Sequence, residues 1–258
     1  MDIKDLQTNW DRFGKTDPLW AVLTYAGKMG NRWDRDEFFD TGAKEIEEVL
    51  AYVESLGISL NKGNALDFGC AVGRLTQALA RHFDTVSGVD IAPSMIDLAH
   101  QFNRHGDRVN YCLNGADNLR IFADDSFDFI ITMITLQHME PRYARNYLKE
   151  FLRVLKPGGV LVFQLPSEPE RAFLRRQRIK RLLPSGVLNY YHNLRHGKLP
   201  QEENGQPGPQ MEMYSIPKAE VLALMESWGA TIENVRQDCH AGNWISYRYC
   251  VRKREDPT

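Results

Sequence analysis

The nine residues Ala65-Leu66-Asp67-Phe68-Gly69-Cys70-Ala71-Val72-Gly73 decide the fold of this chain. They begin as a short apolar strand, turn through small residues and lead into a helix expected from Arg74 to Phe83. A turn of small residues between a strand and a helix lets a ligand approach the backbone closely. Taken alone, this stretch indicates a site for some nucleoside-like ligand.

Short apolar strands alternate with helices after this loop. The pattern predicts strands at 65–68, 85–89, 109–113, 127–133, 159–165, 230–235 and 244–251, and further helices at 94–103, 142–155 and 219–228. Alternation at this spacing indicates βαβ units and a parallel sheet covered by helices on both faces. The last two strands have only a loop between them, which predicts a closing antiparallel pair. We therefore expect an α/β fold with a doubly wound sheet, mostly parallel, whose last strand is antiparallel.

The start of the chain and one internal stretch depart from this alternation. Residues 1–60 are expected to form an N-terminal helical cap with a loop-like start and a helix at about 42–56. The packing side of this cap should carry its aromatic residues, namely Trp20, Trp33, Phe38 and Phe39. Residues 61–258 form the α/β domain, interrupted at about 166–215 by an insertion that we expect to act as a lid.

Two acidic residues decide which ligand the small-residue loop would hold. Asp67 stands immediately before the loop, and Asp90 ends the next strand. A dinucleotide site expects the spacing G-x-G-x-x-G and a pyrophosphate on the helix N-terminus. Here the spacing is G-x-A-x-G, and the carboxylate of Asp67 suits a ligand that carries an ammonium and a sulfonium but no phosphate. Asp90 can accept both hydroxyls of a ribose. Dinucleotide binding is the alternative.

These segments resemble the motifs of class I S-adenosylmethionine-dependent methyltransferases, whose first motif has the form acidic residue-x-G-x-G-x-G. The similar segments, in the family's order, are residues 66–73, 89–95 (Val-Asp-Ile-Ala-Pro-Ser-Met), 114–117 (Asn-Gly-Ala-Asp), 126–129 and 152–162. Together they cover residues 64–165, and the resemblance implies a Rossmann-like fold. There are two departures, since Ala71 replaces the middle glycine and Gly115 stands where many members carry an acidic residue.

The resemblance also implies which residues would hold S-adenosylmethionine. They are Asp67 with Gly69, Cys70, Ala71 and Gly73 at the methionine end, Asp90 at the ribose, Ile91 and Met95 on the adenine, Ala116 and Asp117 at its edge, and Met133 near the sulfonium. Ile91 and Met95 could instead be ordinary core residues, because ligand pockets are largely apolar in any case.

His138 is the candidate catalytic residue. Methyl transfer needs alignment, and it needs a base only if the acceptor arrives protonated. His138 follows the fourth expected strand, in a loop that should face the cofactor at the carboxyl end of the sheet. It could instead cap the next helix or satisfy buried backbone groups. Gln137 could orient the acceptor.

Two further clusters lie in or near the expected lid. Residues 171–183 form a basic run that could contact a membrane surface, a nucleic acid or an acidic substrate, although a solvated lid helix is the favoured interpretation. Tyr190, Tyr191, His192 and His196 could line an acceptor pocket or be ordinary core residues, and His240 is another candidate for the pocket. No third ligand accompanies the two spaced histidines, so we expect no metal site.

The composition limits the class of partner. The 258 residues carry a formal net charge of −2, which gives no global attraction to nucleic acid, so a nucleic-acid partner is not expected. Four scattered cysteines, no apolar leader and no membrane-length apolar stretch indicate a cytoplasmic protein. We expect a methyltransferase that uses S-adenosylmethionine and acts on an oxygen or nitrogen of a small-molecule acceptor. The alternatives are an RNA or protein methyltransferase and a non-catalytic module that binds S-adenosylmethionine. The sequence gives no oligomeric state.

Overall fold

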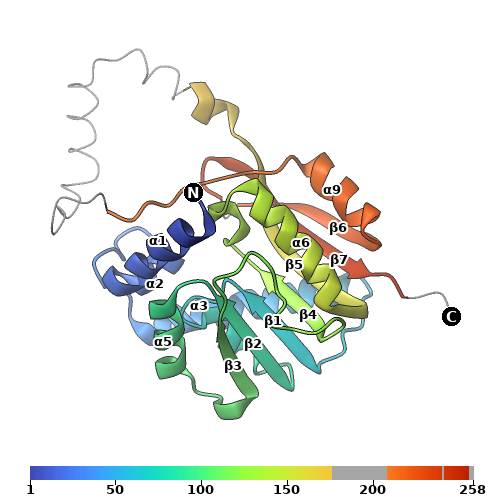
Figure 1. Ribbon diagram of the computed structural model, residues 1–258, viewed down its shortest axis with the longest axis horizontal. Helices are drawn as coiled ribbons and strands as arrows, with labels where there is room; N and C mark the ends of the chain where they lie inside the picture. The colour runs from blue at the N-terminus through green and yellow to red at the C-terminus, as the bar shows by residue number, and fades with distance from the viewer. Residues whose placement is uncertain (176–207, 240, 256–258) are drawn as a thin grey trace.

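The computed structural model describes residues 1–175, 208–239 and 241–255, and its centre is a seven-stranded sheet (Figure 1). In spatial order the strands are β3 (Val109–Leu113), β2 (Thr85–Asp90), β1 (Asn64–Phe68), β4 (Phe127–Thr132), β5 (Leu155–Pro169), β7 (Trp244–Lys253) and β6 (Ala230–Asp238). Strands β1 to β5 pair in parallel, and β7 is antiparallel to both of its neighbours. The doubly wound, mostly parallel Rossmann-like sheet predicted from the sequence is confirmed.

Helices cover both faces of the sheet. The helices are α1 (Ile3–Thr16), α2 (Pro18–Val22), α3 (Arg35–Ser55), α4 (Arg74–Leu79), α5 (Pro93–Phe102), α6 (Pro141–Val154) and α9 (Lys218–Ser227). Apolar residues of α3, α4 and α5 share one core with the sheet, and those of α6 and α9 share the other. Figure 1 is viewed from the side of α6 and α9. Strand order reverses between β1 and β4, which is where doubly wound sheets bind ligands.

The N-terminal region is more helical than the sequence pattern predicts. The loop-like start expected there is wrong, because Asp2 caps α1 by accepting hydrogen bonds from the backbone N–H groups of Lys4 and Asp5. Helix α3 also begins before Gly42, since the side chain of Asp34 caps it. Gly42 therefore lies inside α3. A glycine is needed at this position because a Cβ would lie 2.4 Å from the backbone oxygen of Arg74.

The aromatic side chains expected on the packing side of the cap do lie in its core. Phe38 and Trp33 are buried, and the indole N–H of Trp33 donates to the carbonyl of Leu23 at 3.1 Å. Trp20 and Phe39 are partly buried against the same cluster. Helix α1 is fixed to the start of α5, where the side chain and backbone oxygens of Asp11 accept hydrogen bonds from Ser94.

The expected lid lies mostly outside the described residues. Residues 166–169 continue β5 and pair with β7, so they are not part of a separate insertion. The basic run is described only as far as residue 175, and the tyrosine and histidine cluster at 190–196 and His240 lie outside the described residues. Residues 208–217 return to the domain as an extended segment, which we call the return segment.

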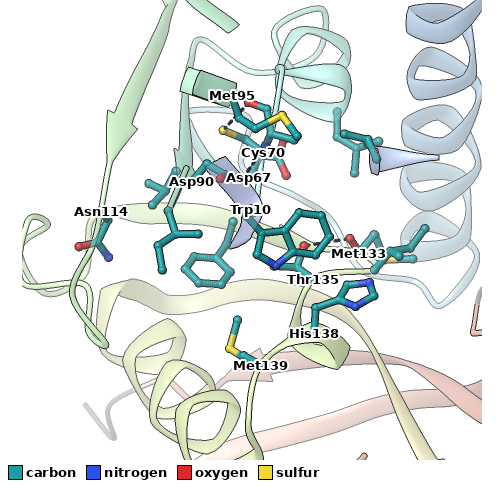
Figure 2. Close-up of a pocket in the computed structure, with 18 of the residues that line it drawn as sticks. Trp10, Asp67, Cys70, Asp90, Met95, Asn114, Met133, Thr135, His138 and Met139 are labelled. Atoms are coloured by element: carbon teal, nitrogen blue, oxygen red, sulfur yellow. Dashed lines mark hydrogen bonds between the residues drawn. The ribbon is translucent and has the colours of Figure 1, made fainter. Parts of the chain in front are cut away.

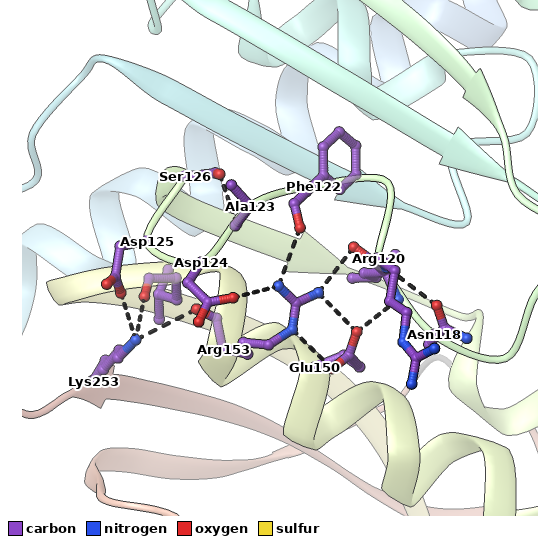
Figure 3. A network of polar contacts seen from close by, with 12 residues as sticks. Asn118, Arg120, Phe122, Ala123, Asp124, Asp125, Ser126, Glu150, Arg153 and Lys253 are labelled. Atoms are coloured by element: carbon purple, nitrogen blue, oxygen red, sulfur yellow. Dashed lines mark hydrogen bonds and ion pairs between the residues drawn. The ribbon is translucent and has the colours of Figure 1, made fainter.

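A guanidinium fixes the loop between β3 and β4 onto α6 (Figure 3). Arg153 donates to both carboxylate oxygens of Glu150, to the backbone carbonyls of Leu119 and Phe122, and to the side chain of Asp124. These contacts hold residues 119–124, which lead into β4, against the C-terminal end of α6.

Two features are absent from the described residues, namely a membrane-spanning helix and a metal-binding cluster. None of their helices combines the length and apolar character needed to cross a membrane. Among the same residues, no group of three or more His, Cys, Asp or Glu side chains is arranged to hold a metal ion.

Candidate active site

A cavity of about 970 Å³, its open mouth included, lies over the carboxyl ends of β1, β2 and β4. The small-residue loop after β1 forms one wall, and the loop after β4 with its 3-10 turn Leu136–His138 forms another. Helices α1 and α2 contribute the apolar side of the cavity.

The loop after β1 follows a backbone path that needs small residues. Gly69, Ala71 and Gly73 have φ values of +77°, +47° and +85°, which is the left-handed region. A Cβ on Gly69 would lie 2.3 Å from the side chain of Thr135, so the loops after β1 and β4 pack in direct contact. Ala71 is strained because an L side chain disfavours a positive φ.

Asp67 is a buried carboxylate with little compensation. It is 2% exposed, and its Oδ2 atom accepts a hydrogen bond from the hydroxyl of Thr76 at 2.6 Å. Burial raises the pKa of the Asp67 carboxyl to about 7, although the hydrogen bond from Thr76 opposes the shift. A cation beside Asp67 would supply the missing compensation.

Asp90 links the loop after β1 to the end of β2. Its Oδ2 atom accepts from the backbone N–H of Ala71 at 2.8 Å, and its Oδ1 atom accepts from that of Ala92 at 2.9 Å. Burial raises the pKa of Asp90, against the effect of these backbone donors. Each carboxylate oxygen has a second acceptor position, so Asp90 can still receive two hydroxyl donors.

The cavity brings together most of the residues named from the sequence (Figure 2). Those that line it are Asp67, Gly69, Cys70, Ala71, Asp90, Ile91, Met95, Met133 and His138. Met95 and Met133 are almost fully buried and expose only their edges to the cavity.

Gly73, Ala116 and Asp117 do not line the cavity as the structure describes it. Gly73 instead makes room for Tyr111, whose hydroxyl oxygen would lie 2.1 Å from a Cβ. Ala116 and Asp117 are exposed, and the carbonyl of Ala116 accepts a hydrogen bond from the hydroxyl of Tyr147, which does line the cavity.

Sequence reasoning missed the contribution of α1 to the cavity. Ile3, Leu6 and Trp10 line it, with Ala21 and Val22 of α2 beside them. The spacing i, i+3, i+7 of the first three residues, behind the acidic cap residue Asp2, was the available signal for an amphipathic helix. Asn114, Thr135 and Met139 also line the cavity, although none of them was predicted as a site residue.

Arg74 is the one cationic side chain among the described residues of the cavity wall. It is 4% exposed and pairs with Glu45 at 2.8 Å, and its Nε atom has no hydrogen-bond partner. A pyrophosphate would meet two carboxylates here and one arginine that is already paired. The charge of the wall therefore disfavours a dinucleotide.

His138 stands at the opposite wall and is held on both ring nitrogens. Its Nδ1 atom lies 2.8 Å from the carbonyl oxygen of Glu212 in the return segment, and its Nε2 atom lies 3.1 Å from Nε2 of Gln137. The ring makes an edge contact with Trp10 at 5.2 Å between centroids. Burial lowers the pKa of His138, against the hydrogen bond to Glu212, so the neutral imidazole is favoured.

The backbone just before this turn is also strained. Ile134 has a φ of +59°, a value that β-branched residues rarely adopt, and it lines the cavity. Strain of this kind collects at binding and catalytic sites.

Residues 65–159 match the sequence profile of a family described as "Methyltransferase domain". The match spans the strand, loop and helix units that build the cavity. Over these residues the chain is similar to a methyltransferase domain.

Named relatives agree with this domain. A ubiquinone biosynthesis O-methyltransferase of Coxiella burnetii (strain RSA 331 / Henzerling II) is 31% identical over 159 residues, which are 59% of this chain and 65% of that protein. Another protein of the same name, from Xanthomonas campestris pv. campestris (strain B100), is 28% identical over 63% of this chain and 69% of its own length. The chain thus spans just under two thirds of the Coxiella relative that it matches.

One solved structure is similar in fold to this chain over nearly its whole length. Magnesium protoporphyrin IX methyltransferase from Synechocystis PCC 6803, crystallised with bound SAH, gives a TM-score of 0.64 at 15% identity and covers 98% of this chain and 100% of its own. At this identity the likeness concerns the fold alone, which here includes the N-terminal helices outside the matched domain.

Ala71→Gly should make the protein more stable. Glycine adopts the positive φ of position 71 without the steric cost that alanine bears, and this gain exceeds the added freedom of the unfolded chain. We expect the free energy of unfolding in urea to rise by about 1 kcal/mol. Ala51→Gly on the exposed face of α3 is the control, and should lower it by about 1 kcal/mol. A loss of stability in Ala71→Gly would contradict the strain assigned to the loop.

Asp67→Asn should gain stability relative to the parent protein as the pH rises from 4 to 7.5. The raised pKa means that the unfolded state ionises at lower pH than the folded state, so Asp67 destabilises the fold increasingly between pH 4 and about 7. Asparagine keeps an acceptor for Thr76 and does not titrate. The difference in free energy of unfolding between the two proteins should grow by an amount on the order of 3 kcal/mol across this range. A difference that is constant with pH would show that Asp67 does not titrate abnormally.

Proposed function

We propose that this protein transfers a methyl group from S-adenosylmethionine to a small-molecule acceptor, with oxygen preferred over nitrogen as the methylated atom. The observation that carries the proposal is the pair of carboxylates, Asp67 and Asp90, at the ends of β1 and β2 in a cavity that has no free cation among its described wall residues. S-adenosylmethionine needs such a wall because it carries an ammonium, a sulfonium and a ribose diol but no phosphate.

The residues of the cavity fit this cofactor. Asp67 would pair with the ammonium of its methionine end, and Nε of Arg74, the atom of that guanidinium without a hydrogen-bond partner, would donate to the carboxylate. Asp90 would accept the ribose hydroxyls, and Ile91 and Met95 would pack on the adenine. The bound cofactor supplies an activated methyl group, so the protein has to provide orientation and exclusion of water.

Ala116 and Asp117 stay in the proposal only as an outer contact of the adenine. Their exposed position favours Asn114, a buried residue of the cavity wall, for the adenine edge. The side chain of Asn114 is held by the carbonyl of Asn118 at 2.7 Å, which gives it a fixed orientation. Cys70, Ala71 and Met133 would contact the methionine end, while Gly73 would act through the shape of the loop.

The acceptor would lie between His138 and the apolar side of the cavity. Trp10, Leu6 and Met139 offer it no charge, which suits an uncharged organic molecule. A hydroxyl acceptor must lose a proton as it gains the methyl group, and we propose that neutral His138 takes that proton. The names of the Coxiella and Xanthomonas relatives, both O-methyltransferases, support oxygen as the target.

We further propose that residues 1–60 form a cap and that an insertion after β5 closes the acceptor side. The contacts of α1 and α2 with the cavity support the first part. The four cysteines are all free, as expected in a reducing compartment, which supports the cytoplasmic location that we propose.

The cofactor site can be tested by calorimetry. S-adenosylmethionine and S-adenosylhomocysteine should both bind, and NAD should not. Asp90→Ala should weaken binding of both adenosyl ligands by 10-fold or more, because it removes charge-assisted hydrogen bonds to two hydroxyls. Asp97→Ala, on the exposed face of α5, is the control and should leave the affinity unchanged. Unchanged affinity in Asp90→Ala would refute the placement of the ribose.

The reaction can be tested with methyl-labelled S-adenosylmethionine and a cell extract divided into a small-molecule filtrate and a macromolecular fraction. Label should move into the filtrate. In a second assay with pure acceptors, catechol, which is uncharged and carries hydroxyl groups, should be methylated in preference to phosphoethanolamine, which is charged. Transfer only to the macromolecular fraction would favour an RNA or protein methyltransferase. Tight cofactor binding with no transfer to either fraction would favour a non-catalytic module.

A further inference from the structure

A series of side-chain hydrogen bonds connects the interior strand β5 to His138. It starts at Gln164 on β5, passes through Gln137 to His138, and ends on the return segment at the carbonyl of Glu212. Gln164 is completely buried, and Gln137 is 3% exposed. Buried amides with every polar atom engaged are held in one orientation.

The direction of each hydrogen bond follows from one backbone donor. The N–H of the strained residue Ile134 can only donate, and it points to Oε1 of Gln164 at 3.1 Å. The NH₂ group of Gln164 must therefore face the other way, where it donates to Oε1 of Gln137 at 3.1 Å and to the hydroxyl of Ser246 at 2.5 Å. With its oxygen so engaged, Gln137 must turn its own NH₂ group toward Nε2 of His138.

The opposite end of the series requires the same arrangement. The carbonyl of Glu212 can only accept, so Nδ1 of His138 carries a proton. Nε2 then has a free lone pair, which accepts the hydrogen bond from Gln137. A fixed donor at one end and a fixed acceptor at the other thus specify a neutral His138 with its proton on Nδ1.

We propose that Gln164 is a positioning residue for methyl transfer, which acts through Gln137 to keep His138 as a neutral base with Nε2 as its proton acceptor. This inference rests on the proposed function. In the reaction the acceptor hydroxyl would take the place of the Gln137 amide at Nε2 and give its proton to that nitrogen. Its oxygen would form the new bond to the methyl group as the bond from methyl to the sulfonium sulfur breaks, which leaves the electron pair of that bond on the sulfur of S-adenosylhomocysteine. The ring becomes an imidazolium, and its Nδ1–H remains bonded to the carbonyl of Glu212.

Charges elsewhere do not account for this state of His138. The titratable groups around it are Glu140 beside its own turn, Glu212 and Tyr214 on the return segment, and Asp67, Cys70, Arg74, Asp90 and Tyr147 in the cavity wall. Burial is the larger influence on the His138 pKa and lowers it, and the contact with the Glu212 carbonyl acts in the opposite direction. If Gln137 turned its oxygen toward Nε2, it would stabilise the protonated ring, which cannot act as a base.

The test is the titration of His138, followed by NMR in protein labelled with ¹⁵N-histidine and assigned with His138→Asn. In the parent protein the nitrogen pattern should be that of a neutral ring protonated on Nδ1. Gln164→Met removes the groups that orient Gln137 and adds no charge, so His138 should titrate at higher pH than in the parent. Gln137→Met should act in the same direction, and it tests the proposal even if Gln164→Met fails to fold.

Ser246→Ala is the matched control. It removes a hydrogen bond of the same Gln164 amide on the side away from His138 and should leave the titration unchanged. With catechol as acceptor, kcat of Gln164→Met at mildly acidic pH should fall about tenfold, with no change in the KM for S-adenosylmethionine.

An Nε2-protonated ring in the parent protein, or an unchanged titration in both methionine variants, would overturn the proposal. Equal shifts in Ser246→Ala would show a general packing effect and would also overturn it. Because the titration needs neither cofactor nor acceptor, its failure is distinguishable from failure of the proposed methyl transfer, which calorimetry and labelling test separately.

Discussion

The burial of an acidic side chain, Asp67, at the end of the central strand is the constraint on which the site depends. A carboxylate that is 2% exposed and has one hydroxyl donor is costly to ionise, and its pKa of about 7 expresses that cost. Asp67 lies at the end of β1, directly before the loop that a ligand would approach. A bound cation would stabilise the ionised carboxylate and so offset the free energy that its burial costs. Stability and binding are thus opposed at this residue, as is common where a protein is built for a ligand.

The second carboxylate shapes the loop itself. Asp90 binds the backbone N–H of Ala71, so the end of β2 fixes the turn that follows β1. This contact holds Ala71 at its positive φ, and Gly69 packs against Thr135 from the loop after β4. Three strand ends are therefore connected through one small-residue turn. A larger side chain in the turn would disturb the β1 and β4 loops together.

The central domain could be predicted from the sequence because its signals are local. A strand, a small-residue turn and a helix follow one another within residues 65–83, and an acidic residue ends each of the first two strands. Hydrophobic periodicity and turn residues identify each strand and helix. The alternation of strands with helices then indicates that the strands pair in parallel. The same reasoning identified nine of the residues that line the cavity, since all but Met95, in the first turn of α5, belong to strand ends and the loops after them.

The remaining features depend on contacts between distant segments. Helix α1 reaches the cavity through packing on α5, and nothing near Trp10 in the sequence indicates that it faces His138. Gly73 looked like a ligand residue, but its role depends on Tyr111 in β3. The state of His138 depends on Gln164 and on Glu212, which is 74 residues away in the chain. The spacing of residues within single elements carries no information about these pairings.

With its raised pKa, Asp67 should be largely protonated in the free protein at pH 6 and should ionise when the cofactor binds. The most direct measurement is the number of protons released on binding of S-adenosylmethionine at pH 6, obtained by calorimetry in buffers with different heats of ionisation. With a pKa of about 7 in the free protein, release of about one proton is expected. Binding with no release of protons at this pH would show that Asp67 is already ionised in the free protein.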